Sequence, residues 1–304
     1  ATRAMFANQA DAEGHLKPAG GLFVGTLPEK VPIANTSLEW AGTRWTQLMW
    51  PLTTDDVDRH VILMHESWHR VQDQIGLPAA SPDNRHLNTF DGRFWVQLEW
   101  RALERALRTS GEDRRQAIED ALLFRRQRHR LVASAAEQER ALEAAEGLAE
   151  YTGIRLSGMS ADERLAYAAR QLAQRPAQFP TFNRSFAYLT GPAYALLLDT
   201  TGQPWRVGLT AATDLGQRLQ DALGIELADA SADQLAGRAA RYDGETLRKT
   251  EAQRETARQA RHAALTRQYF EDPVLILPLE KMNMTFDPRR IEPVGELGTY
   301  FPTL

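Results

Sequence analysis

The sequence feature that most constrains this chain is the segment HESWH at residues 65–69, which lies inside a stretch with helical periodicity. Apolar residues recur at steps of three and four between residues 57 and 75, which predicts an amphipathic helix with one apolar stripe. Thr53 or Thr54 is placed to cap this helix, and Gly76 is placed to end it. The two histidines therefore lie on one helix face, at the edge of a buried stripe.

The spacing of these residues is the HExxH pattern, which has a chemical meaning. Two imidazoles one helical turn apart can bind a single metal ion, and Glu66 beside them can take a proton from a water at that metal. The alternative interpretation is structural: a buried helix in which His65 and His69 make only hydrogen bonds. The pattern alone is short, so the rest of the chain has to decide between the two.

Composition excludes several classes of protein. Charged residues make up 25% and hydrophobic residues 43% of the 304 residues, which is typical of a globular protein. The net charge of -4 lacks the basic excess of nucleic-acid-binding proteins. The chain has no cysteine, which excludes disulfides, a thiol nucleophile and a Cys-ligated zinc site. No apolar run is long enough to span a membrane. The N-terminal sequence ATRAMF has neither an initiator Met nor an apolar signal region, which is typical of a processed mature form or of an excised fragment; of the two, we expect export followed by signal removal.

Periodicity along the chain predicts an α+β fold that is mostly helical, in three segments. Residues 1–54 are expected to form an irregular lead-in of about 20 residues and a small antiparallel sheet, and residues 55–200 a helical catalytic core. Residues 201–304 are expected to add helices and short terminal strands, including VLILPL and MNMTF. Beyond the motif helix, the expected helices are 92–107, 113–134, 161–172, one that opens at Gly191-Pro192, 209–223, and 231–270 with an interruption near Asp243-Gly244.

Two neighbouring stretches carry opposite charge. Residues 101–130 hold nine arginines against five acids, and the next helix carries Glu137, Glu139, Glu143, Glu146 and Glu150. For the first three of these glutamates we expect a solvated acidic face that pairs with the Arg-rich helix.

The last two glutamates lie in EGLAEYT, residues 146–152, which resembles the second-helix signature of gluzincins. These are HExxH zinc peptidases of the zincin type, in which a Glu from a second helix is the third zinc ligand. The metzincin pattern is excluded because Gln72 and Ile75 occupy the positions of its Gly and third His. The resemblance implies a zincin-like core that binds one Zn²⁺ ion, with the following roles: His65, His69 and Glu146 as ligands, Glu66 as general base, and Glu150 as the acceptor of a hydrogen bond from a ligating His.

Other positions remain open. The 76 residues between His69 and Glu146 leave room for another third ligand, and Glu99 is the main competitor. Gluzincins often use a Tyr or His to stabilise the developing oxyanion, and Tyr194 and Tyr188 are candidates. The edge strand that lines the cleft in such enzymes is expected at residues 44–50.

The predicted function is hydrolysis of peptide bonds in a peptide or protein substrate. A di-iron carboxylate bundle is an alternative because residues 66–69 also form an ExxH, but the chain has no second one. The other alternative is a zincin-like binding or scaffold protein without catalysis. Glu66 argues against it, because a purely structural metal needs no base.

Overall fold

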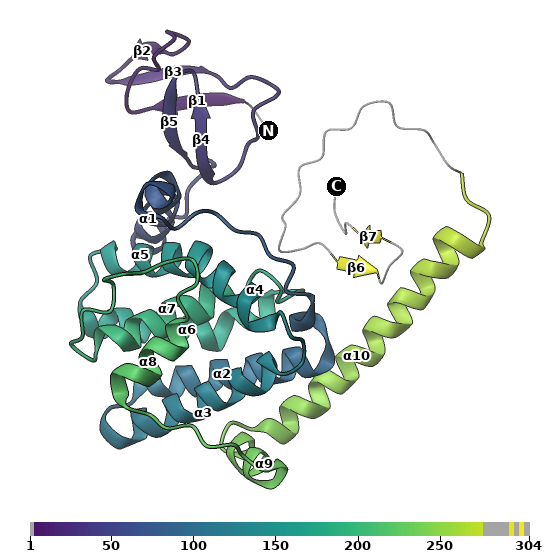
Figure 1. Ribbon diagram of the computed structural model, residues 1–304. Coiled ribbons are helices and arrows are strands. Elements are labelled where there is room, and N and C mark those ends of the chain that lie inside the picture. Colours follow the sequence, from purple (N-terminus) through teal and green to yellow (C-terminus); the bar gives the residue numbers. More distant parts are fainter. Residues whose placement is uncertain (1–2, 276–291, 295–297, 301–304) are drawn as a thin grey trace.

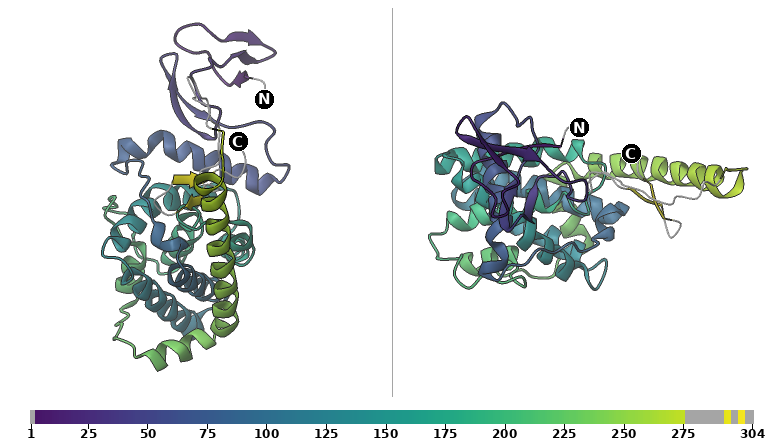
Figure 2. Two further views of the ribbon diagram at one scale, coloured as in Figure 1. Left: turned by 90° about the vertical axis from the view of Figure 1, so that its right-hand side faces the viewer. Right: turned by 90° about the horizontal axis from the view of Figure 1, so that it is seen from above.

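A computed structural model describes residues 3–275, 292–294 and 298–300 of the chain. This part is mostly helical and carries small antiparallel sheets, which confirms the predicted α+β, mostly helical class. The motif helix α1 lies between the strands β1–β5 on one side and the other helices of the body on the other (Figures 1 and 2). None of the helices in the described ranges is long and apolar enough to cross a membrane.

The N-terminal strands form two small antiparallel sheets. The first has the order β1-β3-β2 and the second is a hairpin; their strands are β1 (Ala4–Ala7), β2 (Lys17–Ala19), β3 (Leu22–Thr26), β4 (Thr36–Trp40) and β5 (Thr43–Gln47). The expectation of an irregular lead-in is wrong, because β1 and β2 lie within it. Their sequences, AMFA and KPA, are only four and three residues long and do not alternate between apolar and polar residues, so the sequence lacks the pattern that marks a strand.

Helix α1 (Asp56–Val71) confirms the predicted motif helix and corrects its cap. Asp55 caps it, since its side chain accepts a hydrogen bond from the Asp58 backbone N–H at 2.9 Å. Thr53 and Thr54 are therefore not the cap. A 3₁₀ turn, η1 (Gln72–Ile75), continues the chain to Gly76, whose φ of 77° ends the helical segment as expected.

The remaining elements follow the predicted order. They are η2 (Arg85–Asn88), α2 (Phe90–Arg108), α3 (Gly111–His129), α4 (Ala135–Leu142), the π-helical turn η3 (Glu143–Gly147), α5 (Leu148–Leu156), α6 (Ala161–Gln174), η4 (Arg175–Gln178), α7 (Ala187–Asp199), α8 (Leu215–Leu223), α9 (Ala232–Ala240), α10 (Gly244–Thr266), η5 (Arg267–Glu271), β6 (Glu292–Val294) and β7 (Gly298–Tyr300). The break near Asp243-Gly244 is confirmed, because it separates α9 from α10, which extends away from the helical body (Figure 1).

Two local predictions need correction. Pro192 does not open its helix but lies inside α7, which begins at Ala187. Of the predicted strand VLILPL only Val274 and Leu275 are described, and they are not in a strand. The segment MNMTF lies outside the described residues.

Of the acidic face predicted on α4 and η3, Glu137 is exposed as expected, but Glu139 and Glu143 are buried and pair with α3. Glu139 accepts two hydrogen bonds from Arg128, at 2.8 and 2.7 Å, and Glu143 accepts two from Arg125, at 2.8 and 2.7 Å. All four side chains are 3% exposed or less. Burying an unpaired charge costs a large amount of free energy. These bidentate ion pairs therefore explain how an Arg-rich helix and a Glu-rich helix can pack together in the interior.

Candidate metal centre

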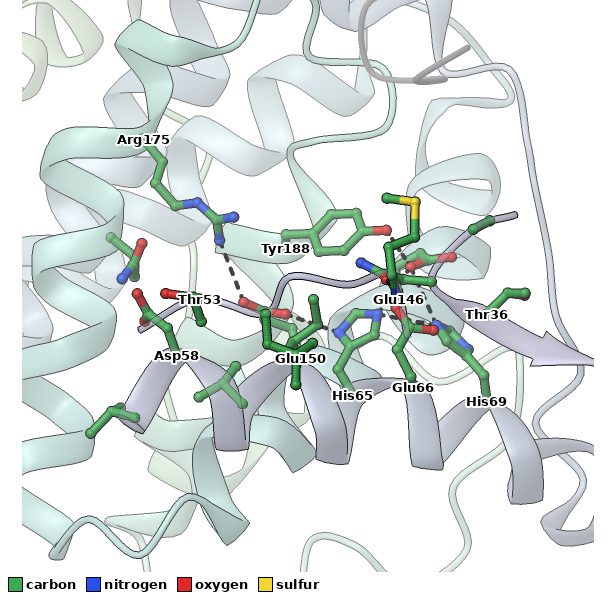
Figure 3. Close-up of a pocket in the computed structure, with 18 of the residues that line it drawn as sticks. Thr36, Thr53, Asp58, His65, Glu66, His69, Glu146, Glu150, Arg175 and Tyr188 are labelled. Carbon is green, nitrogen blue, oxygen red and sulfur yellow. Dashed lines mark hydrogen bonds and ion pairs between the residues drawn. The ribbon is translucent and has the colours of Figure 1, made fainter. Parts of the chain in front are cut away.

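Three side chains from two elements converge to form a compact group of metal-ligating atoms. His65 and His69 project from the same face of α1, and Glu146 meets them from η3 (Figure 3). The two imidazole Nε2 atoms are 3.1 Å apart. Oε2 of Glu146 lies 3.5 Å from His65 Nε2 and 3.6 Å from His69 Nε2. This is the ligand set that the sequence predicted.

The spacing of these atoms fits a tetrahedral metal. Zinc bonds to imidazole nitrogen and carboxylate oxygen are about 2.0–2.1 Å long, so two ligand atoms of a tetrahedral ion lie about 3.3 Å apart. The three observed separations, 3.1, 3.5 and 3.6 Å, bracket this value. His65 and Glu146 are also buried, as expected of side chains that face a bound ion. The donor set of two nitrogens and one oxygen leaves a fourth position for water or substrate.

Close contacts between helices bring the group together. A Cβ added to Gly153 of α5 would lie 2.5 Å from the Val61 carbonyl oxygen of α1, so only a glycine permits this approach. On the other side, a Cβ on Gly147 would lie 2.9 Å from the Gly191 Cα of α7. Gly147 of the EGLAEYT segment therefore allows η3 to approach α7 closely. Glu146 lies in the π-helical turn just before this contact.

Both histidines are held by hydrogen bonds on the ring nitrogen that faces away from the group. His65 Nδ1 donates to Glu150 Oε2 at 2.9 Å, which is the role predicted for Glu150. His69 Nδ1 donates to Gln72 Oε1 at 3.1 Å. Such partners fix the tautomer that leaves Nε2 free to bind a metal. Gln72 was noted in the sequence only as the residue that excludes a metzincin, and no motif pointed to its part in orienting His69.

Two arginines hold the carboxylates of this site, and sequence reasoning missed both. Arg184 donates to Glu146 Oε1 at 2.6 Å, and Arg175 donates to Glu150 Oε1 at 3.4 Å. In each glutamate the opposite oxygen, Oε2, faces the histidines. Both arginines come from segments far from the motif in sequence, so neither periodicity nor spacing identified them.

The charge state of the group follows from these contacts. Burial alone would lower the pKa of His65, but its hydrogen bonds to Glu146 and Glu150 raise that pKa to about 10. For Glu146, burial acts to raise the pKa, but hydrogen bonds from His65 and His69 and the charge of Arg184 hold it well below its usual range. Glu146 is thus ionised, as a metal ligand must be. A metal ion that binds His65 has to displace its proton, so metal binding is coupled to pH.

Glu66 lies beside the group and makes no hydrogen bond through one of its oxygens. It is 7% exposed, and its Oε2 is buried without a partner among the residues that the structure describes. Burial raises the pKa of this carboxyl above its usual value, and the neighbouring histidines oppose the shift. A carboxylate that is buried, unpaired and close to a metal-ligating group has the properties of a general base.

Of the two candidate tyrosines, the structure brings only Tyr188 to the site. Its hydroxyl donates to Glu146 Oε2, and its ring stacks on His65 with the ring centroids 5.5 Å apart. Tyr194 is fully buried elsewhere and donates to Glu99 Oε1 at 2.8 Å. The prediction for Tyr194 is wrong, because this residue packs in the core against Glu99 and does not reach the metal-ligating group.

Glu99, the alternative third ligand, is also placed away from the histidines. It is fully buried and forms ion pairs with Arg128 and with Arg125, the latter at 3.6 Å. Both partners come from the neighbouring helix α3. The described residues contain one group of metal-ligating side chains, at His65, His69 and Glu146, so they offer no second site for a di-iron centre.

A large groove gives access to the metal-ligating group. Its volume is about 1800 Å³, and α1, α6, the 79–81 loop and the β4–β5 hairpin line it (Figure 3). The strand expected to line the cleft was residues 44–50. From this range the structure places Arg44 and Met49 in the lining, but the neighbouring strand β4 contributes Thr36 and Ser37. The hairpin thus lines the groove as expected, with β4 as its outer strand.

Comparisons with known proteins add no relative. No protein-family model matches the chain, and neither a curated protein nor a solved structure shows significant similarity to it. Any statement on function therefore depends on the geometry of this site.

Proposed function

We propose that this chain is a zinc-dependent hydrolase that cleaves peptide bonds, with His65, His69 and Glu146 as ligands. One observation carries the proposal: the unpartnered, buried carboxylate oxygen of Glu66 lies in the same groove as a tetrahedral set of metal-ligating atoms. A site that only held a structural metal would not need a base there. The imidazole and carboxylate donors suit zinc.

His65, His69 and Glu146 would hold the metal ion, which would supply Lewis acidity and lower the pKa of a bound water toward neutrality. Glu66 takes the proton of the attacking water and later passes it to the leaving amine. Its raised pKa suits both steps, since it brings the affinity of the carboxylate for a proton closer to neutral pH.

Tyr188 is the donor that this proposal assigns to the oxyanion of the tetrahedral intermediate. Burial and the charge of Glu146 raise the pKa of Tyr188 well above its usual value, so the hydroxyl stays protonated and can donate. It already donates to the metal-ligating oxygen of Glu146, which places it at the group where the substrate carbonyl would be polarised. Stacking on His65 holds its ring in place.

The outer edge of β4 supports a peptide as the substrate. The two-residue turn at Ala41-Gly42 makes Trp40 and Thr43 a hydrogen-bonded pair, so Ser37, three residues earlier, belongs to a non-hydrogen-bonded pair. The backbone N–H and C=O of Ser37 therefore point away from β5. Ser37 lines the groove, where these groups can pair with an extended peptide.

Hydrolysis of a defined peptide mixture tests the proposal. We expect the zinc-loaded wild type to cleave it, a chelator to abolish cleavage, and added zinc to restore it. Glu66→Gln should keep its metal and lose about 100-fold to 10,000-fold in rate, whereas the exposed Glu137→Gln serves as the matched control and should cleave like the wild type. Wild-type rates in Glu66→Gln would contradict the assigned base. An inert but metal-loaded wild type would favour the scaffold alternative.

A further inference from the structure

We propose that the groove binds an extended polypeptide on both sides of the bond to be cut, so that the chain is an endopeptidase. This inference rests on the proposed function and adds a substrate class to it. It excludes enzymes that remove single residues from a chain end and enzymes that hydrolyse small amides.

The extent of the groove along α1 is the first argument. Asp55, before the first turn of α1, and Asp73, beyond its last turn, both line the groove, with Glu66 between them. At about 1.5 Å of rise per residue, Asp55 lies roughly 16 Å and Asp73 roughly 10 Å from Glu66 along the helix axis. An extended chain rises about 3.3 Å per residue, so there is room for about five residues on one side and about three on the other.

The size and lining of the groove agree with a long ligand. Its volume of about 1800 Å³ exceeds the roughly 300–1,000 Å³ of pockets that enclose small molecules. On the Asp55 side the walls include Ala166 and Tyr167 of α6, and the Tyr167 hydroxyl donates to Asp58 at 2.8 Å. Ala79 of the 79–81 loop and Asp73 of η1 also line the groove. The lining therefore includes residues of α6 and of the segment after α1, in addition to the metal-ligating group.

The charges around the reacting groups are the second argument. An enzyme that acts on chain ends binds the terminal amine or carboxylate with a charged group about one residue from the bond to be cut. Here two arginines beside the metal-ligating group are each engaged by a glutamate of the site, Arg184 by Glu146 and Arg175 by Glu150. Arg44, toward the Asp73 end, pairs with Asp73 at 3.0 Å. These pairs favour an internal segment, which brings no terminal charge.

The test uses zinc-loaded protein and a set of peptides of nine residues with acetylated and amidated ends, beside the same sequences shortened to four residues and versions with free ends. Mass spectrometry gives the position of each cut. We expect internal cleavage of the blocked nine-residue peptides, and a fall in kcat/KM of about tenfold or more on shortening, because remote contacts contribute to transition-state binding.

The outcomes separate the two proposals. Stepwise loss of single residues from free ends, with the blocked peptides untouched, would overturn the endopeptidase inference and leave the hydrolase proposal standing. Absence of cleavage in every peptide by the zinc-loaded protein would overturn both.

Variants that narrow the groove provide a second readout. Ala166→Trp and Ala79→Trp each place a large side chain in the lining of the groove, at positions on different elements that are not among the proposed ligands. Each should lower kcat/KM on the nine-residue peptides about tenfold with unchanged zinc content. Ala173→Trp is the matched control, since Ala173 is exposed on α6 and does not line the groove. Wild-type rates in both groove variants would overturn the inference.

Discussion

The contact between Gly191 of α7 and Gly147 of η3 is so close that adding a single methyl group, in Gly191→Ala, should destabilise the fold. A Cβ on Gly191 would lie 2.4 Å from the Cα of Gly147, about 1 Å short of ordinary van der Waals contact. The three atoms nearest to this Cβ all belong to the backbone of Gly147, which cannot rotate out of the way. In Gly191→Ala the helix α7 therefore has to move away from η3. Overpacking of this kind costs about 1–3 kcal/mol in free energy of unfolding.

For a chain of this size, about 2 kcal/mol corresponds to a fall in Tm of about 4 °C. Thermal unfolding followed by circular dichroism measures it. Gly237→Ala is the matched control, because Gly237 lies in α9 and an added Cβ meets nothing within 4 Å. There the same change should stabilise the helix by about 0.5–1 kcal/mol. A Gly191→Ala protein that melts at the wild-type temperature would refute the close-packing argument.

The same variant should affect the proposed reaction. Tyr188 lies one turn before Gly191 on α7, and it bonds to Glu146, the residue next to Gly147. A shift of about 1 Å between α7 and η3 separates this pair, and misplacement of that size can cost about 100-fold in rate. Zinc content should change less than the rate, because His65 and His69 stay on α1.

Three further predictions concern single groups. Tyr188→Phe should keep its zinc and lose about 100-fold in kcat, because one oxyanion donor is removed. Zinc affinity should fall as the pH drops, because zinc competes with the proton on His65, whose pKa is raised to about 10; calorimetric titration with zinc at several pH values measures this, and equal affinities would contradict it. Burial acts to raise the pKa of Glu139, but the charge and hydrogen bonds of Arg128 hold it well below the usual 4.5. Ionised Glu139 therefore stabilises the fold above pH 4.5, and this contribution is lost as the pH falls through the lower pKa of the folded state. In urea unfolding Glu139→Gln should lose about 3–5 kcal/mol at neutral pH, because Arg128 stays buried with one partner fewer, and its stability should depend less on acid pH than that of the wild type.

The part of the site that sequence predicts is the part carried by local spacing. HExxH fixes the positions of His65, Glu66 and His69 on one helix, so any helix at this place brings them together. The spacing of Glu146 and Glu150, one helical turn apart and on either side of Gly147, predicted the third candidate ligand and the hydrogen-bond partner of His65. The convergence of His65, His69 and Glu146, and the hydrogen bond from His65 to Glu150, were therefore predictable from two short segments.

The parts that sequence did not predict depend on packing between distant segments. Arg175 and Arg184 reach the site from two different turns, and neither position carries a pattern of its own. Tyr188 and Tyr194 differ only in the face of α7 that they occupy, and the misplaced start of this helix at Pro192 removed the means to tell them apart. Glu139 and Glu143 resembled a solvated face because nothing in their spacing shows that two arginines of α3 meet them in the interior.

Metal content tests the central claim most directly. The protein is purified without added zinc and without a histidine tag, and elemental mass spectrometry compares the wild type with Glu146→Ala and with Glu137→Ala, a control at an exposed glutamate of α4. We predict about one zinc ion per chain in the wild type and the control, and a sharp loss in Glu146→Ala, because the third ligand is removed. A wild type that takes up no zinc even when incubated with it, or a Glu146→Ala variant that holds zinc as tightly as the wild type, would contradict the proposed site.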